Sequence, residues 1–118
     1  MLKFFGYKKC STCRKAEKAL EKMDRPYQFT DITETPPSRE ELKKILRHSG
    51  AAVRKLFNTS GVQYKELKIK DKAAGMSEEQ ILTLLAGNGR LIKRPLVSDG
   101  SRATVGFDEK EFTRLWDK

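Results

Sequence analysis

Residues 2–13, LKFFGYKKCSTC, decide the fold of this chain. Leu2–Phe5 is a short apolar run of the kind that forms a buried strand. The loop that follows leads into a predicted helix from about Ser11 to Met23, in which apolar residues recur three and four positions apart. The sequence therefore places two cysteines, Cys10 and Cys13, where a strand passes into a helix.

The spacing of these cysteines is typical of a redox pair. At the start of a helix, unpaired N–H groups and the positive end of the helix dipole stabilise a thiolate, which favours Cys10 as the nucleophile. Cys13 lies one turn further on, near enough to close a disulfide, and is the expected resolving thiol. Four basic residues flank the pair and are expected to favour the thiolate further: Lys8, Lys9, Arg14 and Lys15.

Other uses of the two cysteines are less well supported. A structural zinc site needs about four ligands, whereas the chain offers two thiols and one histidine, His48. Two inert buried cysteines would not need to lie between a strand and a helix. We therefore expect redox chemistry, no metal site, and no role for His48, which is expected on the surface near a helix end.

Composition and charge indicate a single domain over residues 1–118, with 37% hydrophobic and 35% charged residues. A net charge of +9 is compatible with nucleic-acid binding. However, the 25 basic residues are interleaved with the 16 acidic ones and never form a run longer than two. The pattern favours a solvated helical surface over direct nucleic-acid binding, and leaves an acidic protein or a small anion as partners.

The use of cysteine also predicts a compartment. Both cysteines lie in one four-residue stretch, unlike the dispersed cysteines of secreted disulfide scaffolds, so the cytoplasm is expected. The N-terminal apolar run is too short for a signal peptide, and no stretch has the length of a transmembrane helix. No membrane partner is expected.

The first half of the chain continues with a predicted strand over 27–32, after a break at Pro26. Ser38 and Glu41 form the pattern of a capping box, which predicts a helix ending near Gly50. A second short helical piece follows at 53–57.

In the second half, a capping box at 77–80 predicts a helix with three inward residues: Ile81, Leu84 and Leu85. Residues 96–98 and 103–106 form a predicted hairpin around Asp99-Gly100. A last helix from Asp108 is expected to bury three residues: Phe112, Leu115 and Trp116.

The predicted order is β-α-β, a helical middle over about 38–90, and β-β-α. This order is that of an α/β, thioredoxin-like fold with a central mixed four-stranded sheet and a helical insertion. In this fold the loop before the third strand faces the cysteines, and its proline is typically cis, so we expect a cis bond before Pro95. Arg94 then either binds an oxyanion or pairs with the thiolate, or is an ordinary solvated arginine, and the sequence leaves these alternatives open.

Three motifs, GYKKCSTCRKA at 6–16, LFNTSG at 56–61 and KRPL at 93–96, resemble the arsenate reductase (ArsC)-like family, with the bacterial Spx/MgsR-type group as the nearest branch. The resemblance implies a thioredoxin-like fold and a bacterial cytosolic redox protein. It implies no cofactor beyond glutathione as a thiol co-substrate, and glutathione or a small redoxin as reductant. The site expected from the residues and the resemblance together comprises Cys10, Cys13 and Arg94 as catalytic residues and Ser11, Thr12, Arg14 and Pro95 as binding residues.

Departures from the family pattern bear on the activity. Of the three arginines that bind the anion in the arsenate reductases, the middle one falls on Arg94, the first on Asn58, and the third near Gly106. The histidine found before the cysteine is also absent, with Gly6 in that region. Because each arginine supplies a charged, bidentate donor, its loss predicts at best weak arsenate reduction.

The Spx-like regulators provide an alternative function. They carry a Cys-x-x-Cys switch at this place. They bind RNA polymerase, at the C-terminal domain of its α-subunit, through a surface that includes a glycine matching Gly50. A glycine is equally expected there as a helix C-cap. A thiol–disulfide redox protein is thus the main hypothesis, and a redox-sensing transcription regulator is the alternative.

Overall fold

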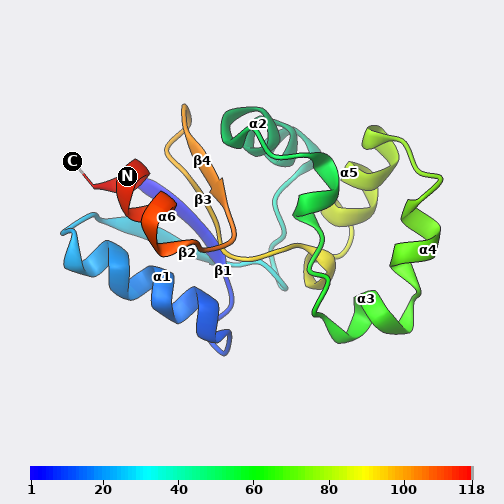
Figure 1. The fold of residues 1–118 in the computed structure, drawn as a ribbon, viewed down its shortest axis with the longest axis horizontal. Helices are drawn as coiled ribbons and strands as arrows, with labels where there is room; N and C mark the ends of the chain where they lie inside the picture. The colour runs from blue at the N-terminus through cyan, green and yellow to red at the C-terminus, as the bar shows by residue number, and fades with distance from the viewer. Residues whose placement is uncertain (118) are drawn as a thin grey trace.

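The computed structural model describes residues 1–117 and is built on a four-stranded sheet in the order β2-β1-β3-β4 (Figure 1). The central strand β1 (Leu2–Gly6) runs parallel to β2 (Tyr27–Asp31) and antiparallel to β3 (Leu96–Ser98). β3 pairs with β4 (Ala103–Val105) as an antiparallel hairpin. The predicted mixed sheet is confirmed, with strand bounds that differ from the expected ones by at most one residue.

Two helices, α1 (Ser11–Lys22) and α6 (Glu109–Trp116), cover one face of the sheet (Figure 1). Side chains alternate along a strand, so each strand serves two cores. The core under α1 and α6 contains these fully or almost fully buried residues: Leu2, Phe4, Cys13, Ala16, Leu20, Val97, Phe112 and Trp116. Leu115, expected inside, is only half-buried, because the inward face of α6 consists of positions 112 and 116, one turn apart.

The helical insertion packs on the opposite face of the sheet, against Phe5 and Leu96. Its elements are α2 (Arg39–Ser49), η1 (Val53–Leu56), α3 (Val62–Glu66), α4 (Ile69–Ala73), α5 (Glu78–Ala86) and η2 (Gly89–Leu91). The short helices α3 and α4 were not individually predicted. They bury only Ile69 and Ala73, too few for an apolar stripe, and the left-handed Lys68 between them has φ 52°.

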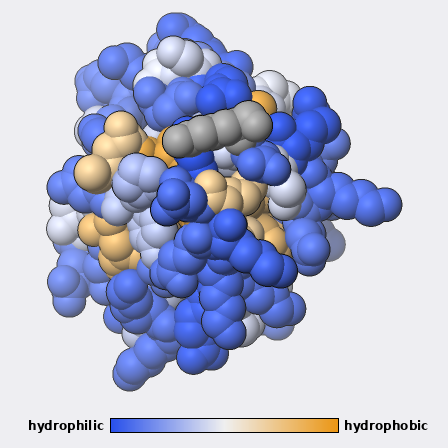
Figure 2. All heavy atoms as spheres, turned by 90° about the vertical axis from the view of Figure 1, so that its left-hand side faces the viewer, coloured by the Kyte–Doolittle hydropathy of each residue, from blue (hydrophilic) through white to orange (hydrophobic). Residues whose placement is uncertain are grey.

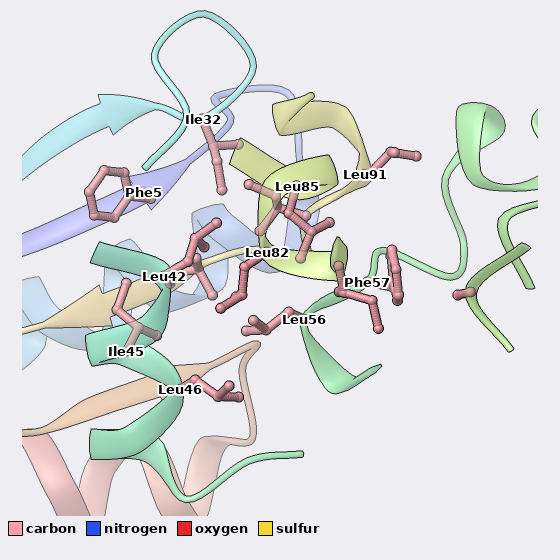
Figure 3. Packing of buried hydrophobic residues seen from close by; sticks show 14 of the residues in the cluster. Phe5, Ile32, Leu42, Ile45, Leu46, Leu56, Phe57, Leu82, Leu85 and Leu91 are labelled. Atoms are coloured by element: carbon pink, nitrogen blue, oxygen red, sulfur yellow. The ribbon is translucent and has the colours of Figure 1, made fainter. Parts of the chain in front are cut away.

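Figure 3 shows how the insertion fills its core: Leu42 of α2, Leu56 of η1 and Leu82 of α5 meet between these elements. The inward residues of α5 are Ile81, Leu82 and Leu85, whereas Leu84 is half-buried. The expectation for Leu84 was wrong because α5 lies between α2 and η1, and both neighbours require apolar contacts from it.

The two predicted capping boxes have different outcomes. At α5 the box is complete, since the Ser77 hydroxyl accepts the Gln80 N–H and the Gln80 side chain accepts the Ser77 N–H. At α2 only half forms: the Ser38 hydroxyl accepts the Glu41 N–H at 3.2 Å. The Glu41 carboxylate instead accepts from Lys3 Nζ at 3.3 Å, so a contact to the sheet replaces the second half.

Within residues 1–117, the helices are too short or too polar to cross a membrane. The left-hand face of Figure 1 is mostly hydrophilic, and its hydrophobic residues form small, separated patches (Figure 2). His48 is exposed in the last turn of α2, as predicted.

At Gly89 the backbone of the insertion packs closely against the backbone of Ile32, directly after β2. A Cβ at this position would lie 1.7 Å from the carbonyl oxygen of Ile32, so the two backbones approach too closely for any side chain. The nearby Gly87 is different, because a Cβ there would stand 3.6 Å from its nearest neighbours.

We predict that Gly89→Ala destabilises the protein by about 3 kcal/mol, at the upper end of the usual cost of overpacking, because a backbone must move. Gly87→Ala is the matched control and should change the free energy of unfolding by no more than about 0.5 kcal/mol. Urea denaturation of both variants measures the difference. Equal stability of the two variants would contradict the close approach.

Candidate redox-active site

The site forms where β1 passes into α1. The Cys10 N–H donates to the Tyr7 carbonyl at 3.0 Å, which closes the loop, and the Arg14 N–H donates to the Cys10 carbonyl at 3.1 Å, which starts the helix. Cys10 is the N-cap residue, with an extended backbone at φ −87° and ψ 121°. This geometry places its sulfur beside the free N–H groups of the first helical turn.

Gly6 leaves the space that Cys13 occupies. A Cβ on Gly6 would lie 2.6 Å from the Phe4 ring and 3.2 Å from the Cys13 sulfur. Any side chain at this position would collide with the Phe4 ring and crowd the Cys13 sulfur.

The loop before β3 brings Arg94 to the same place. The Arg94–Pro95 bond is cis, as predicted, and Pro95 is buried. Arg94 is half-buried, its guanidinium lies 5.2 Å from the centre of the Tyr7 ring, and it is near enough to the Cys10 sulfur to lower the pKa of that thiol. Of the alternatives that the sequence left open, this geometry favours pairing with the thiolate.

The two sulfurs have opposite electrostatic environments. Burial raises the pKa of Cys10, but hydrogen bonds from the Cys13 N–H, the Cys13 thiol, Arg94 and the Thr12 N–H outweigh it, so the pKa is lowered overall. Burial raises the pKa of Cys13 to about 12, and the neighbouring Cys10 contributes to the rise. The Tyr7 N–H, 3.4 Å from the Cys13 sulfur, opposes that rise. The accessible thiol therefore ionises more easily than an ordinary cysteine, and the buried one less easily.

The flanking lysines are not among the main groups that lower the pKa of Cys10. Lys8 forms an ion pair with Glu17, with 3.0 Å between Nζ and Oε1, and its charge is thereby taken up. Lys9 and Lys15 are exposed. The cation that lowers the pKa of Cys10 is Arg94, from a loop more than 80 residues further along the chain.

A groove of about 640 Å³ lies over Cys10 and gives it access to a ligand. Its walls come from the start of α1, the loop before β3, the segment after β4 and the start of α3. The residues that line it are Cys10, Thr12, Asn58, Ser60, Gly61, Val62, Lys93, Arg94, Val105, Gly106, Phe107 and Asp108. The structure thus brings Cys10, Thr12 and Arg94 together. Ser11 and Arg14 are exposed on α1 and do not line the groove.

Asn58 and Gly106, which stand where two arginines are expected in arsenate reductases, both line this groove. Gly106 has a φ of +77°, and a Cβ there would lie 2.6 Å from Cε of Lys93. An arginine at 106 would therefore require a strained backbone and displacement of Lys93.

Sequence reasoning missed the contacts of Glu17. This carboxylate is buried, and it accepts hydrogen bonds from Lys8 Nζ at 3.0 Å and from the Tyr27 hydroxyl at 2.8 Å. The available signal was its spacing, since Glu17 follows Cys13 by four positions and so lies on the same face of α1.

The mixed sheet, the Cys-x-x-Cys pair at a helix start and the facing cis-proline define a thioredoxin-like protein with a redox-type cysteine site. The model of the ArsC family matches residues 5–115. The chain belongs to the ArsC family, which confirms the resemblance seen in its motifs.

Three relatives illustrate the range of similarity. The uncharacterized protein YusI of Bacillus subtilis is 50% identical over 98% of this chain and 98% of its own length. The global transcriptional regulator Spx of Listeria monocytogenes is 30% identical over 98% of this chain and 86% of its own length. The crystal structure of an ArsC family related protein from Bacteroides fragilis superimposes with a TM-score of 0.92, at 46% identity, over 97% of this chain and 96% of that one.

We predict that Arg94 lowers the pKa of Cys10. In a Cys13→Ser background, the pH dependence of iodoacetamide alkylation should give a Cys10 pKa below the ordinary cysteine value. Arg94→Ala should move this profile to higher pH, because the thiolate loses its cation, and Arg94→Lys should restore part of the shift without the planar fork. Lys15→Ala, which removes an exposed positive charge near the start of α1, is the control. Identical profiles for all four proteins would exclude Arg94 from the site.

Proposed function

We propose that the chain is a cytoplasmic thiol–disulfide oxidoreductase. The Cys10 thiolate attacks one sulfur of a substrate disulfide, and the other sulfur leaves as a thiolate. The Cys13 thiolate then attacks the Cys10 sulfur of this mixed disulfide and releases the second substrate thiolate. The substrate gains two electrons and two protons in all, and the protein is left with a Cys10–Cys13 disulfide.

The observation that carries this proposal is the difference between two free thiols one helical turn apart. Cys10 is partly exposed beside Arg94 and a groove, whereas Cys13 is completely buried behind it. The first is suited to attack an external disulfide, and the second to act only once the first has reacted. A thiol reductant such as glutathione or a redoxin would return the pair to its reduced form, and the proposal requires no metal or bound cofactor.

The test is a trap. Cys13→Ser should hold substrate proteins on Cys10 as mixed disulfides, which dithiothreitol releases for identification by mass spectrometry. The double variant Cys10→Ser, Cys13→Ser is the control and should hold none. Wild-type protein oxidised with diamide should show a monomeric, intramolecular disulfide by alkylation and mass shift. Oxidation only to intermolecular dimers would remove Cys13 from its resolving role.

Arsenate should be at best a poor substrate. The anion carries one to two charges, and of the three expected arginines only Arg94 lines the groove. With glutathione and a glutaredoxin as reductants, we expect a catalytic efficiency below the ordinary enzyme range, which begins at about 10⁴ M⁻¹s⁻¹. A known arsenate reductase assayed in parallel is the control. Turnover within that range would show that Arg94 and the helix start suffice to bind the anion.

A redox-sensing transcription regulator is the second candidate, and the Spx relative supports it. Gly50 ends α2 in the left-handed conformation, with φ +70°, is exposed, and has no atom within 4 Å of a Cβ built on it. It therefore lies on an open surface where a partner domain could dock. The test is co-purification with RNA polymerase, through the C-terminal domain of its α-subunit, in the presence of dithiothreitol. Recovery of that domain would support this function, because no disulfide could then hold the complex.

A further inference from the structure

Glu17 is the buried charged residue of the described chain, with 8% of its surface exposed. It lies on α1 one turn beyond Cys13, against the edge of the sheet. Burying a carboxylate is costly unless charged or hydrogen-bonding partners compensate it. Glu17 has both kinds of partner, since Lys8 Nζ and the Tyr27 hydroxyl donate to the same oxygen at 3.0 Å and 2.8 Å.

Each partner is held by a second contact. The Lys8 ammonium lies 4.1 Å from the centre of the Phe29 ring of β2, an arrangement that favours a cation. The Tyr27 hydroxyl also lies 3.2 Å from a carboxylate oxygen of Glu21, the next turn of α1. Burial and the two carboxylates raise the pKa of Tyr27, so the phenol stays a donor at neutral pH. The loop residue Lys8 is thereby joined to α1 and to β2.

Lys8 follows directly after Tyr7, which contacts both cysteines and Arg94. The Tyr7 N–H points at the Cys13 sulfur at 3.4 Å, and its carbonyl accepts the Cys10 N–H at 3.0 Å. Its ring lies beneath the Arg94 guanidinium. Any movement of the loop at Lys8 would therefore be transmitted to Tyr7 and change the surroundings of the resolving thiol.

We propose that Glu17 is a positioning residue that holds the loop through Lys8 and so keeps the Tyr7 N–H directed at the Cys13 sulfur. The proposal rests on the redox function proposed above. Only the Glu17 side of the pair is buried, since the Lys8 side chain is 67% exposed, and such an ion pair by itself contributes little to stability. What the pair adds is a defined position for the loop.

The position of the loop affects the second step of the reaction, in which Cys13 attacks the mixed disulfide. Cys13 must lose its proton before it attacks the mixed disulfide, and the groups that act on it are the Cys10 sulfur, the Arg94 charge and the Tyr7 N–H. The Tyr7 N–H stabilises the Cys13 thiolate. If the loop shifts, this stabilisation is lost, the pKa of Cys13 rises and resolution slows at a given pH.

The reaction with 5,5′-dithiobis(2-nitrobenzoate) separates the two steps. Attack by Cys10 releases one nitrothiobenzoate anion, and attack by Cys13 on the resulting mixed disulfide releases a second. In Glu17→Gln and in Lys8→Met, we expect the second release to slow about tenfold at pH 7, the drop in thiolate that one pKa unit produces. The first release should slow less than the second, because Tyr7 donates to the Cys13 sulfur and is not among the donors that lower the pKa of Cys10.

Two matched variants serve as controls. Glu21→Gln removes the other carboxylate at Tyr27 without touching Lys8, and Lys9→Met removes the neighbouring lysine of the same loop. Both should keep the wild-type rate of the second release and its pH profile, whereas Glu17→Gln and Lys8→Met should displace that profile to higher pH. The proposal is overturned if the Glu17 and Lys8 variants melt at a lower temperature but leave the second release unchanged, or if the controls slow it equally.

Failure of the redox function itself would look different. Wild-type protein would then release one anion and never the second. In that case the positioning role is measured at the Tyr7 amide, whose hydrogen exchange should quicken in Glu17→Gln and stay unchanged in Glu21→Gln. Unchanged exchange of this amide in both variants would refute the proposal.

Discussion

The structure depends on the pairing of β1 with β3, in which Phe5 lies opposite Leu96. Phe5 is followed by the loop that carries Cys10, and Leu96 is preceded by Arg94 and Pro95. The antiparallel register therefore brings two segments more than 80 residues apart in sequence to the same end of the sheet. A shift of this register by one residue would turn Phe5 to the wrong face and move Arg94 away from the thiolate.

The central position of β1 extends this constraint to the rest of the site. Because β1 also pairs with β2, the loop after Gly6 lies near Phe29 and Tyr27, where Lys8 and Tyr27 reach Glu17. Cys10 is thus placed by main-chain pairing on both sides of one strand. The electrostatic difference between the thiols follows from position, since Cys10 is at the groove and Cys13 is behind it.

Much of this could be predicted from the sequence. The strand at 2–5, the helix after Cys10 and the hairpin around Asp99-Gly100 follow from periodicity and turn residues, and their order predicts the sheet. The cis bond before Pro95 followed from that fold. The partners of charged side chains were not predictable, because Glu17 and Glu41 make tertiary contacts that local patterns do not encode. The same reason explains why the sequence could not decide between the four flanking basic residues and Arg94 as the main cation at Cys10, whose pKa Arg94 lowers.

The backbone at Gly106 has an evolutionary consequence. With φ at +77°, this position disfavours any residue that carries a Cβ, whereas the end of the exposed Lys93 side chain beside it can move aside. An arginine gained at 106 would therefore carry a backbone cost, whereas one gained at 58 would not, because Asn58 is not among the residues with positive φ. Improved anion binding through position 106 would come at the expense of stability.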